Sequence, residues 1–168
     1  NLFTGGIGGR MTSDYAVPLS LNASGIVDCE NDGLILCAET AAKDEAEAQL
    51  EGRYFGGILG YGSHVRIVTS SSASGRAAGY RYSGAQRENV LLGQYVGGIV
   101  GYGNVCRLSG CSTKNGGFIL GSDYVGGIAG GLSNDIQYAI TGDASVSVTA
   151  NASYVIGNSY VGGIVGKN

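Results

Sequence analysis

Proline, charge and long apolar runs are scarce in this chain. A single proline beside 32 glycines in 168 residues does not suit an ordinary helical domain, and the glycines do not recur at every third position, which excludes collagen. No apolar run reaches the ~18 residues that identify a transmembrane helix. The net charge of −3 gives no electrostatic reason to expect nucleic acid or an anionic membrane as a partner.

Metal-ligand and disulfide patterns are also sparse. The cysteines form two near pairs, Cys29 with Cys37 and Cys106 with Cys111, and neither pair is a Cys-x-x-Cys motif. His64 is the single histidine, so we predict no structural zinc and no other metal or cofactor. Four cysteines permit three pairings, and both disulfides and free buried thiols stay open as interpretations.

What the chain does contain is a repeated phrase, Tyr-Val-Gly-Gly-Ile-Val-Gly. Copies with small changes lie at 54–60, 95–101, 124–130 and 160–166, and a degenerate copy lies at 2–8. A recurring apolar and glycine-rich phrase is typical of stacked structural repeats, so each glycine pair marks one rung of a stack. The predicted rung markers are Gly56, Gly57, Gly97, Gly98, Gly126, Gly127, Gly162 and Gly163.

Short β-prone runs lie between the phrases and recur in the same order. The shortest interval contains runs at 105–108 and 117–121, separated by polar and glycine residues. Runs at 26–29 with 33–36, at 71–72 with 90–93, and at 145–148 with 154–157 are assigned to the corresponding places in other intervals. Several strands per repeat without a regular helix predict a coil of parallel strands.

The glycine pair has two possible uses. Glycine permits positive φ and close backbone approach, which favours a bend or bulge that changes the facing of the strand. A phosphate-binding loop is the alternative. No Gly-Lys-Ser/Thr follows the pair, no helix-forming run follows it, and the phrase recurs along the chain. We therefore assign the pair to backbone geometry.

Two insertions interrupt the repeats. Residues 39–52 are rich in helix formers and predict one short helix near 40–50, lying against or capping the stack. A second insertion, a loop at about 73–88, carries the residues that form the predicted ligand or partner surface: Arg76, Tyr80, Arg81, Tyr82 and Arg87. Guanidinium groups and aromatic rings can stack on sugars or hold acidic glycans. Ordinary packing of these side chains along the side of the stack is the alternative.

The chain resembles a known repeat family. Cys111, then Gly117-x-Ile119-x-Gly121, then the phrase at 124–130 is similar to the GLUG repeat. The resemblance covers most of the chain from about Tyr54 onward and, more loosely, 2–36. It implies a right-handed parallel β-solenoid and a secreted or cell-surface location, as in bacterial adhesin-like proteins and non-catalytic regions of immunoglobulin-A-cleaving metalloproteases. It transfers no catalytic residue, and the two insertions depart from it.

One acidic group is a candidate active site. Asp28, Glu30 and Asp32 alternate and could share one face of a strand, where carboxylates could act on a glycosidic bond or bind calcium. A solvated acidic turn is the simpler interpretation. His64 lacks a nucleophile motif such as Gly-x-Ser-x-Gly and is interpreted as a surface or packed histidine. We predict no catalytic residue and no enzyme, and a polysaccharide-cleaving β-helix enzyme is the third hypothesis.

The predicted architecture is one all-β domain over 1–168, a solenoid of about four to five irregular coils. The sequence begins at Asn1 and both ends fall within phrases, so we expect a mature or excised segment without polar capping units. Its ends would join adjoining repeats of a longer chain or stack on other copies in a filament. The leading prediction is an extracellular structural or adhesive segment, and the alternative is a module that binds surface glycans.

Overall fold

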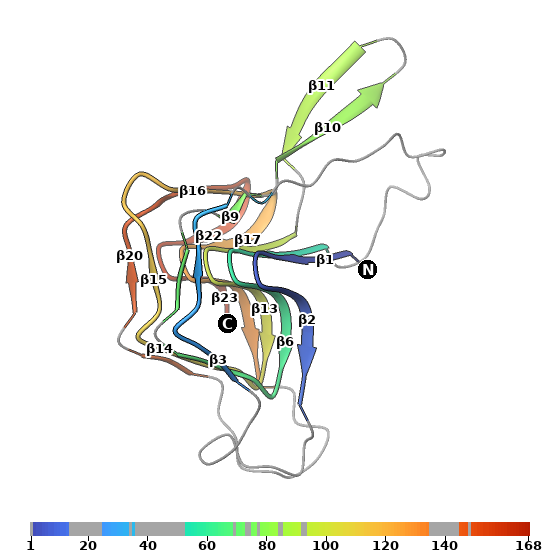
Figure 1. Cartoon of the computed structure of the whole chain (residues 1–168). Coiled ribbons are helices and arrows are strands. Elements are labelled where there is room, and N and C mark those ends of the chain that lie inside the picture. Colours follow the sequence, from blue (N-terminus) through green and yellow to red (C-terminus); the bar gives the residue numbers. More distant parts are fainter. Residues whose placement is uncertain are drawn as a thin grey trace.

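The computed structural model describes residues 2–13, 25–33, 35, 53–68, 70–72, 75–76, 78–83, 86–91, 94–134, 145–147 and 149–168. Within these ranges all regular structure is β, and most strands stack in parallel sheets (Figure 1). None of these residues belongs to a helix that is long and apolar enough to cross a membrane. The short helix predicted near 40–50 lies outside the described residues.

Two five-stranded parallel sheets contain the repeated phrase. The first sheet has the order β1-β5-β12-β17-β22, with bounds Leu2–Gly5, Arg53–Gly56, Tyr95–Gly97, Asp123–Gly126 and Ser159–Gly162. The second sheet has the order β2-β6-β13-β18-β23, with bounds Gly8–Thr12, Leu59–Ser63, Val100–Asn104, Ala129–Ser133 and Val165–Lys167. Each phrase therefore makes two strands, one in each sheet. We number the levels of the stack 1 to 5 from β1 to β22.

Three further sheets complete each level. The third sheet contains β3 (Gly25–Val27), β7 (Arg66–Val68), β14 (Arg107–Ser109) and β19 (Ser145–Ser147). The fourth contains β4 (Glu30–Asn31), β8 (Ser71–Ser72), β15 (Ser112–Thr113) and β20 (Ala150–Asn151). The fifth contains β9 (Gly75–Arg76), β16 (Phe118–Leu120) and β21 (Tyr154–Ile156). On levels 2 to 4 the chain visits the five sheets in the same order, an arrangement compatible with a β-solenoid.

The apolar residues of the phrase form stacked columns in the core. Phe55, Val96 and Val125 pair in register in the first sheet, and all three side chains are fully buried. On levels 2 to 4 the isoleucine after the glycine pair (Ile58, Ile99 and Ile128) is also fully buried, because the chain bends between the two strands and turns this residue inward as well. Burial of each such side chain stabilises the fold by about 1.5–3 kcal/mol.

Close backbone approach explains the first glycine of each pair. A Cβ at Gly56 would collide with the carbonyl oxygen of Leu59, and a Cβ at Gly97 would collide with that of Val100. The phrase glycines do not have left-handed φ values, since Gly110 and Gly116 are the only described glycines that do. The bend therefore depends on the missing side chain, and positive φ plays no part in it.

The order of strands agrees with the sequence prediction in two intervals. In the first interval β3 pairs in the third sheet, at the place predicted for 26–29, whereas β4 lies between this run and the predicted run 33–36, of which Leu34 and Leu36 lie outside the described residues. In the last interval β19 and β21 occupy the places predicted for 145–148 and 154–157. In the second interval the prediction is wrong. Gly75 and Arg76 pair with Ile119 and Leu120 and take the place assigned to 90–93, because this segment follows β8 directly and closes a shorter connection.

The remaining strands of the second interval leave the parallel sheets. β10 (Ala78–Ser83) pairs antiparallel with β11 (Gln86–Leu91), and Figure 1 shows this pair extending away from the stack. The predicted loop insertion at about 73–88 thus contains β9, β10 and the start of β11. The chain then returns to the first sheet at β12.

Candidate functional site

The aromatic residue that opens each phrase stands in a ladder along the first sheet. Neighbouring rings stack from level to level, with centroid separations of 5.3 Å for Phe3 and Tyr54, 5.2 Å for Tyr54 and Tyr95, 4.7 Å for Tyr95 and Tyr124, and 4.9 Å for Tyr124 and Tyr160. On levels 2 to 4 the next residue in the strand is buried in the core, so these rings lie on the outer face of the sheet. We call this column the aromatic ladder.

A second column of rings packs against the ladder from the second sheet. Tyr61 and Tyr102 stack with centroids 5.9 Å apart, and Tyr102 meets Tyr95 edge-on at 4.9 Å. On the next level this column contains Gly131, where a Cβ would collide with the rings of Tyr95 and Tyr102. The missing side chain at Gly131 therefore leaves room for the two rings.

Cations lie against both ends of the aromatic ladder. The guanidinium carbon of Arg10 is 5.6 Å from the ring centroid of Phe3 and 5.5 Å from that of Tyr61. Near the opposite end, Nζ of Lys167 is 4.8 Å from the ring centroid of Tyr124, the last ring but one. These separations fall within the range of cation–π attraction.

Two tyrosines of the aromatic ladder have an unusual backbone conformation. Tyr124 and Tyr160 have φ values of 53° and 52°, a left-handed conformation that costs about 1–2 kcal/mol for a residue with a side chain. Burial, with smaller effects from Tyr124 and Tyr102, raises the pKa of Tyr95, so its hydroxyl is neutral at physiological pH.

Because the rings face one another, the aromatic ladder presents ring edges along its length. Tyr160, 65% exposed, ends the stack.

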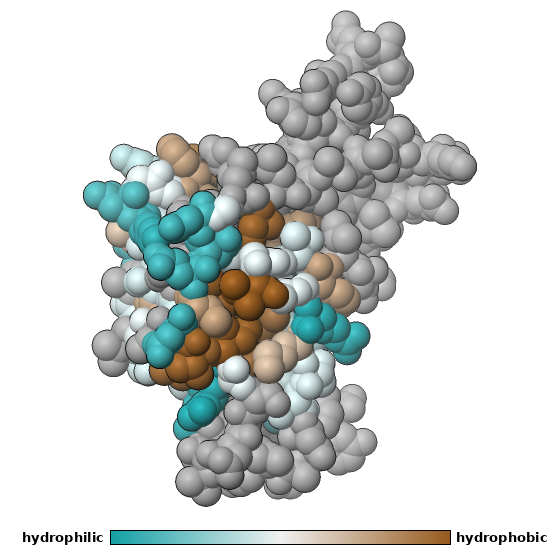
Figure 2. All heavy atoms as spheres, in the orientation of Figure 1, coloured by the Kyte–Doolittle hydropathy of each residue, from teal (hydrophilic) through white to brown (hydrophobic). Residues whose placement is uncertain are grey.

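The core columns reach an open edge at level 5. Val161 is 46% exposed, whereas Val125 at the same position of level 4 is 0% exposed. Ile164 is 36% exposed, whereas the equivalent Ile128 is 0% exposed. Ile7 and Val27 are exposed on level 1. Figure 2 shows apolar residues gathered near the centre of the face seen in Figure 1, with hydrophilic residues beside them.

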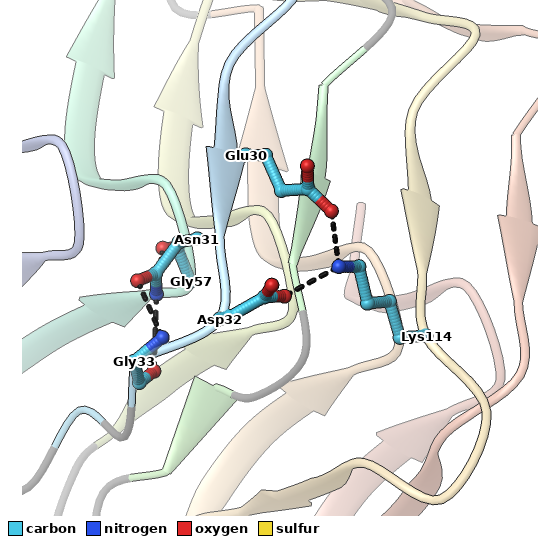
Figure 3. A network of polar contacts seen from close by, with 6 residues as sticks. All are labelled: Glu30, Asn31, Asp32, Gly33, Gly57 and Lys114. Carbon is cyan, nitrogen blue, oxygen red and sulfur yellow. Dashed lines mark hydrogen bonds and ion pairs between the residues drawn. The ribbon is translucent and has the colours of Figure 1, made fainter.

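The acidic group that is a candidate active site forms ion pairs with a lysine. Glu30 and Asp32 both form ion pairs with Nζ of Lys114, which follows β15 two levels away (Figure 3). Hydrogen bonds with Asp32 and then Glu30 raise the pKa of Lys114. Asp28 lies at the corner before β4, with a φ of 52°. Among the described residues, no three His, Cys, Asp or Glu side chains are grouped so that they could hold a metal ion.

A polar column inside the stack was missed by sequence reasoning. Asn31 donates from Nδ2 to the carbonyl oxygen of Gly57 at 2.9 Å and accepts from the amide of Gly33 at 3.0 Å (Figure 3). Two levels away, Thr113 donates to Asn151 from the neighbouring level of the same column. In the sequence, this column is marked by a small polar residue at the same place in each interval. The residue type changes from one interval to the next, which obscures the pattern.

His64 and its neighbour are enclosed at the corner between the second and third sheets. Ser63 Oγ lies 3.3 Å from Nδ1 of His64, and both residues are buried. Burial lowers the pKa of His64. The hydroxyl is therefore not presented to a substrate, and the pair acts in packing.

The described cysteines are free thiols. Cys29 is half-buried, whereas Cys106 and Cys111 are buried, and Cys37 lies outside the described residues. Cys111 donates from Sγ to the carbonyl oxygen of Ile67 at 3.3 Å. Ser70 stands between Cys29 and Cys111 in the stack, and Cys29 donates its amide to Ser70 Oγ. The two cysteines are therefore too far apart to pair with each other.

The predicted ligand surface is divided between two parts of the structure. Arg76 belongs to β9 in the fifth sheet, while Tyr80, Arg81 and Tyr82 belong to β10 and Arg87 belongs to β11. In the antiparallel pair, the backbone of Tyr82 lies opposite that of Arg87. The structure thus brings four of the five residues onto one hairpin-like pair and assigns Arg76 to the stack.

No protein-family model matches this chain, and neither a curated protein nor a solved structure is similar to it.

Proposed function

We propose that this chain is an extracellular structural or adhesive segment, built as a right-handed parallel β-solenoid of about four to five irregular coils with one short helix near 40–50. The secreted or cell-surface location and the handedness follow from the resemblance to the GLUG repeat. The observation that carries the proposal is the open edge, where Val161 is 46% exposed and Val125, its neighbour one level below, is 0% exposed.

The proposed partner of this edge is another level of the same kind. Such a level comes either from adjoining repeats of a longer chain or from level 1 of a second copy, which offers Ile7 as an exposed apolar group. Strands β22 and β23 are the outermost strands of the first two sheets and can accept one more parallel strand. Heterologous contacts of this type propagate without closing and give filaments.

Charge at the edge sets the salt dependence of end-to-end stacking. Arg10 and Lys167 occupy the same column of the second sheet, on levels 1 and 5. A second copy stacked in register would place these cations side by side, and like charges directly opposite each other are destabilising. We therefore expect association to strengthen when salt screens this repulsion, and to strengthen at low salt in an Arg10→Glu variant.

Electron microscopy and analytical ultracentrifugation of the purified chain test the proposal. The matched variant is Gly163→Ala, because a Cβ at Gly163 meets nothing within 4 Å in the single chain. In a stacked copy this Cβ would collide with the next level, as a Cβ at Gly127 does with the backbone of Gly163. Filaments formed by the wild type and lost in Gly163→Ala support end-to-end stacking. Monodisperse short particles of the wild type at high concentration and high salt would rule it out.

A second candidate function is glycan binding by the antiparallel pair β10 and β11. The observation that favours it is that these strands leave the parallel sheets and extend from the stack (Figure 1). A glycan array compares the native chain with an Arg81→Ala/Arg87→Ala variant and with Arg76→Ala, which alters the fifth sheet instead. Loss of glycan binding in Arg81→Ala/Arg87→Ala but not in Arg76→Ala supports recognition by β10 and β11. Absence of glycan binding by the native chain rules out this second candidate function.

A further inference from the structure

Two arginines lie side by side on the third sheet. Arg66 of β7 and Arg107 of β14 are direct register partners on adjacent parallel strands. Ile67 and Leu108, the residues that follow them, are fully buried in the core. Because successive side chains point to opposite faces of a strand, the two arginines project from the outer face, with their backbones about 4.8 Å apart.

Among the described residues, neither arginine has a counter-charge. In the part of the chain that the structure describes, no ion pair or side-chain hydrogen bond is made by Arg66 or Arg107, and the Nε atom of each is buried without a hydrogen-bond partner. Glu30 and Asp32 are occupied by Lys114 instead. Two like charges opposite each other destabilise a sheet, and a buried donor without an acceptor is costly.

The positions that flank the two arginines are small. The same column contains Gly25 on level 1 and Ser145 on level 4. No large side chain of this column therefore stands beside either guanidinium group. The column consists of two adjacent cations flanked by a glycine and a serine.

We propose that Arg66 and Arg107 form a binding site for one oxyanion, a sulfate, phosphate or carboxylate group. Each guanidinium group carries five N–H donors in a planar fork that matches the geometry of an oxyanion. An anion shared by both groups would neutralise their repulsion and supply the acceptor that the Nε donors lack. The site lies on the third sheet, so it does not depend on the open edge or on the antiparallel pair. The anion can be a free ion or a charged group of an acidic polysaccharide.

Nuclear magnetic resonance of the arginine Nε–Hε groups tests the site directly. The full chain is titrated with sodium sulfate at constant ionic strength. We expect the signals of Arg66 and Arg107 to shift together along one saturating curve, while the signal of Arg10 does not follow it. Arg66→Gln and Arg107→Gln should each weaken sulfate binding about tenfold or more, because each removes charge-assisted hydrogen bonds. Arg10→Gln is the matched control and should leave the affinity unchanged.

Non-saturating shifts, equal shifts of Arg10, or unchanged affinity in Arg107→Gln would overturn the proposal. The wild-type titration decides even where a variant fails to fold, since it reports both arginines in the native chain. A second titration compares sodium acetate with an oligomer of galacturonic acid. Tighter binding of the oligomer at the same two signals identifies a polysaccharide as the source of the anion, and equal binding per carboxylate identifies a free ion.

Discussion

At the scale of single residues, the second glycine of each phrase lies between the next level and the interior polar column. A Cβ at Gly127 would collide with the carbonyl oxygen of Gly163 and with the side-chain amide of Asn151. A Cβ at Gly98 would collide with the carbonyl oxygen of Gly127 and with Thr113. The second glycine is thus required only where another level covers it.

Gly127→Ala and Gly163→Ala test this requirement at equivalent positions. We expect Gly127→Ala to lower the free energy of unfolding by about 1–3 kcal/mol, because backbone atoms must move to admit the methyl group. Gly163→Ala should change it by less than about 0.5 kcal/mol in the single chain. Urea denaturation at low protein concentration measures both, and equal losses would contradict the packing argument.

Cys106 is predicted to be unreactive in the native chain. Burial raises the pKa of its thiol from 9.0 to about 12, so almost no thiolate exists at pH 8. Iodoacetamide at pH 8 should label the half-buried Cys29 first and Cys106 only after unfolding, as located by peptide mass spectrometry. Prompt labelling of Cys106 in the folded chain would disprove its burial.

The same pKa shift has a consequence for stability at high pH. The unfolded thiol loses its proton near pH 9 and the folded thiol only near pH 12. The folded state therefore holds more protons in this window, and the free energy of unfolding falls as the pH rises through it. Cys106→Val should reduce this fall. An identical pH profile for the variant would show that Cys106 does not contribute.

Much of the residue chemistry could be predicted from the sequence, but pairing across levels could not. The recurring phrase predicts that glycine serves backbone geometry. The sequence alone does not predict the arginine pair, although Arg66 and Arg107 are separated by the same interval as Gly56 and Gly97. Neighbours across a sheet depend on the strand register, which local sequence does not determine.

At the scale of elements, the aromatic ladder joins the levels of the first sheet on its outer face. Tyr95 stacks on the rings of both adjacent levels and meets Tyr102 edge-on, whereas Tyr160 stacks on Tyr124 alone among the described rings. Aromatic pairs contribute about 0.5–1.5 kcal/mol each beyond burial. The ladder therefore stabilises the interior levels more than the outermost one.

Substitution along the ladder should show this gradient. Tyr95→Leu is expected to lower the free energy of unfolding by about 2 kcal/mol more than Tyr160→Leu, since it removes more ring pairs. Tyr95→Phe keeps the stacked ring and should recover most of the loss. Denaturant unfolding of the three variants provides the measurement, and similar losses for Tyr95→Leu and Tyr160→Leu would count against the ladder.

Strand existence was easier to predict than strand partners. The phrase predicts a bend, and the structure resolves it into two strands in different sheets. The run at 90–93 was assigned to the stack because its composition resembles 117–121, yet β11 pairs antiparallel with β10. Apolar β-prone residues suit either pairing, so local composition does not distinguish a parallel level from an antiparallel pair.

At the scale of the whole molecule, each level contacts mainly its neighbours. Levels 2 to 4 are covered on both sides in the first two sheets, whereas β22 and β23 have a partner strand on one side. In such stacks, stability is roughly a sum of contributions from each repeat and from its nearest neighbours. The outermost strands should therefore open more readily than the middle ones.

Amide hydrogen exchange measures this gradient. We expect β12 and β13 to exchange most slowly and the outermost strands, β1, β2, β22 and β23, to exchange fastest among the strands of the first two sheets. Slow exchange of β22 and β23 that appears only at high protein concentration would indicate that a second copy covers them. Equal exchange rates in all levels would contradict the expectation that the outermost strands open independently of the middle ones.

The corner between the second and third sheets differs in length from level to level. β6 ends at Ser63 and β7 begins at Arg66, whereas β18 ends at Ser133 and β19 begins at Ser145. The strands after both corners keep the same register with β14. Chain length added at this corner therefore leaves the core columns in place. Segments of different length at this corner are therefore compatible with the same core and the same sheet register.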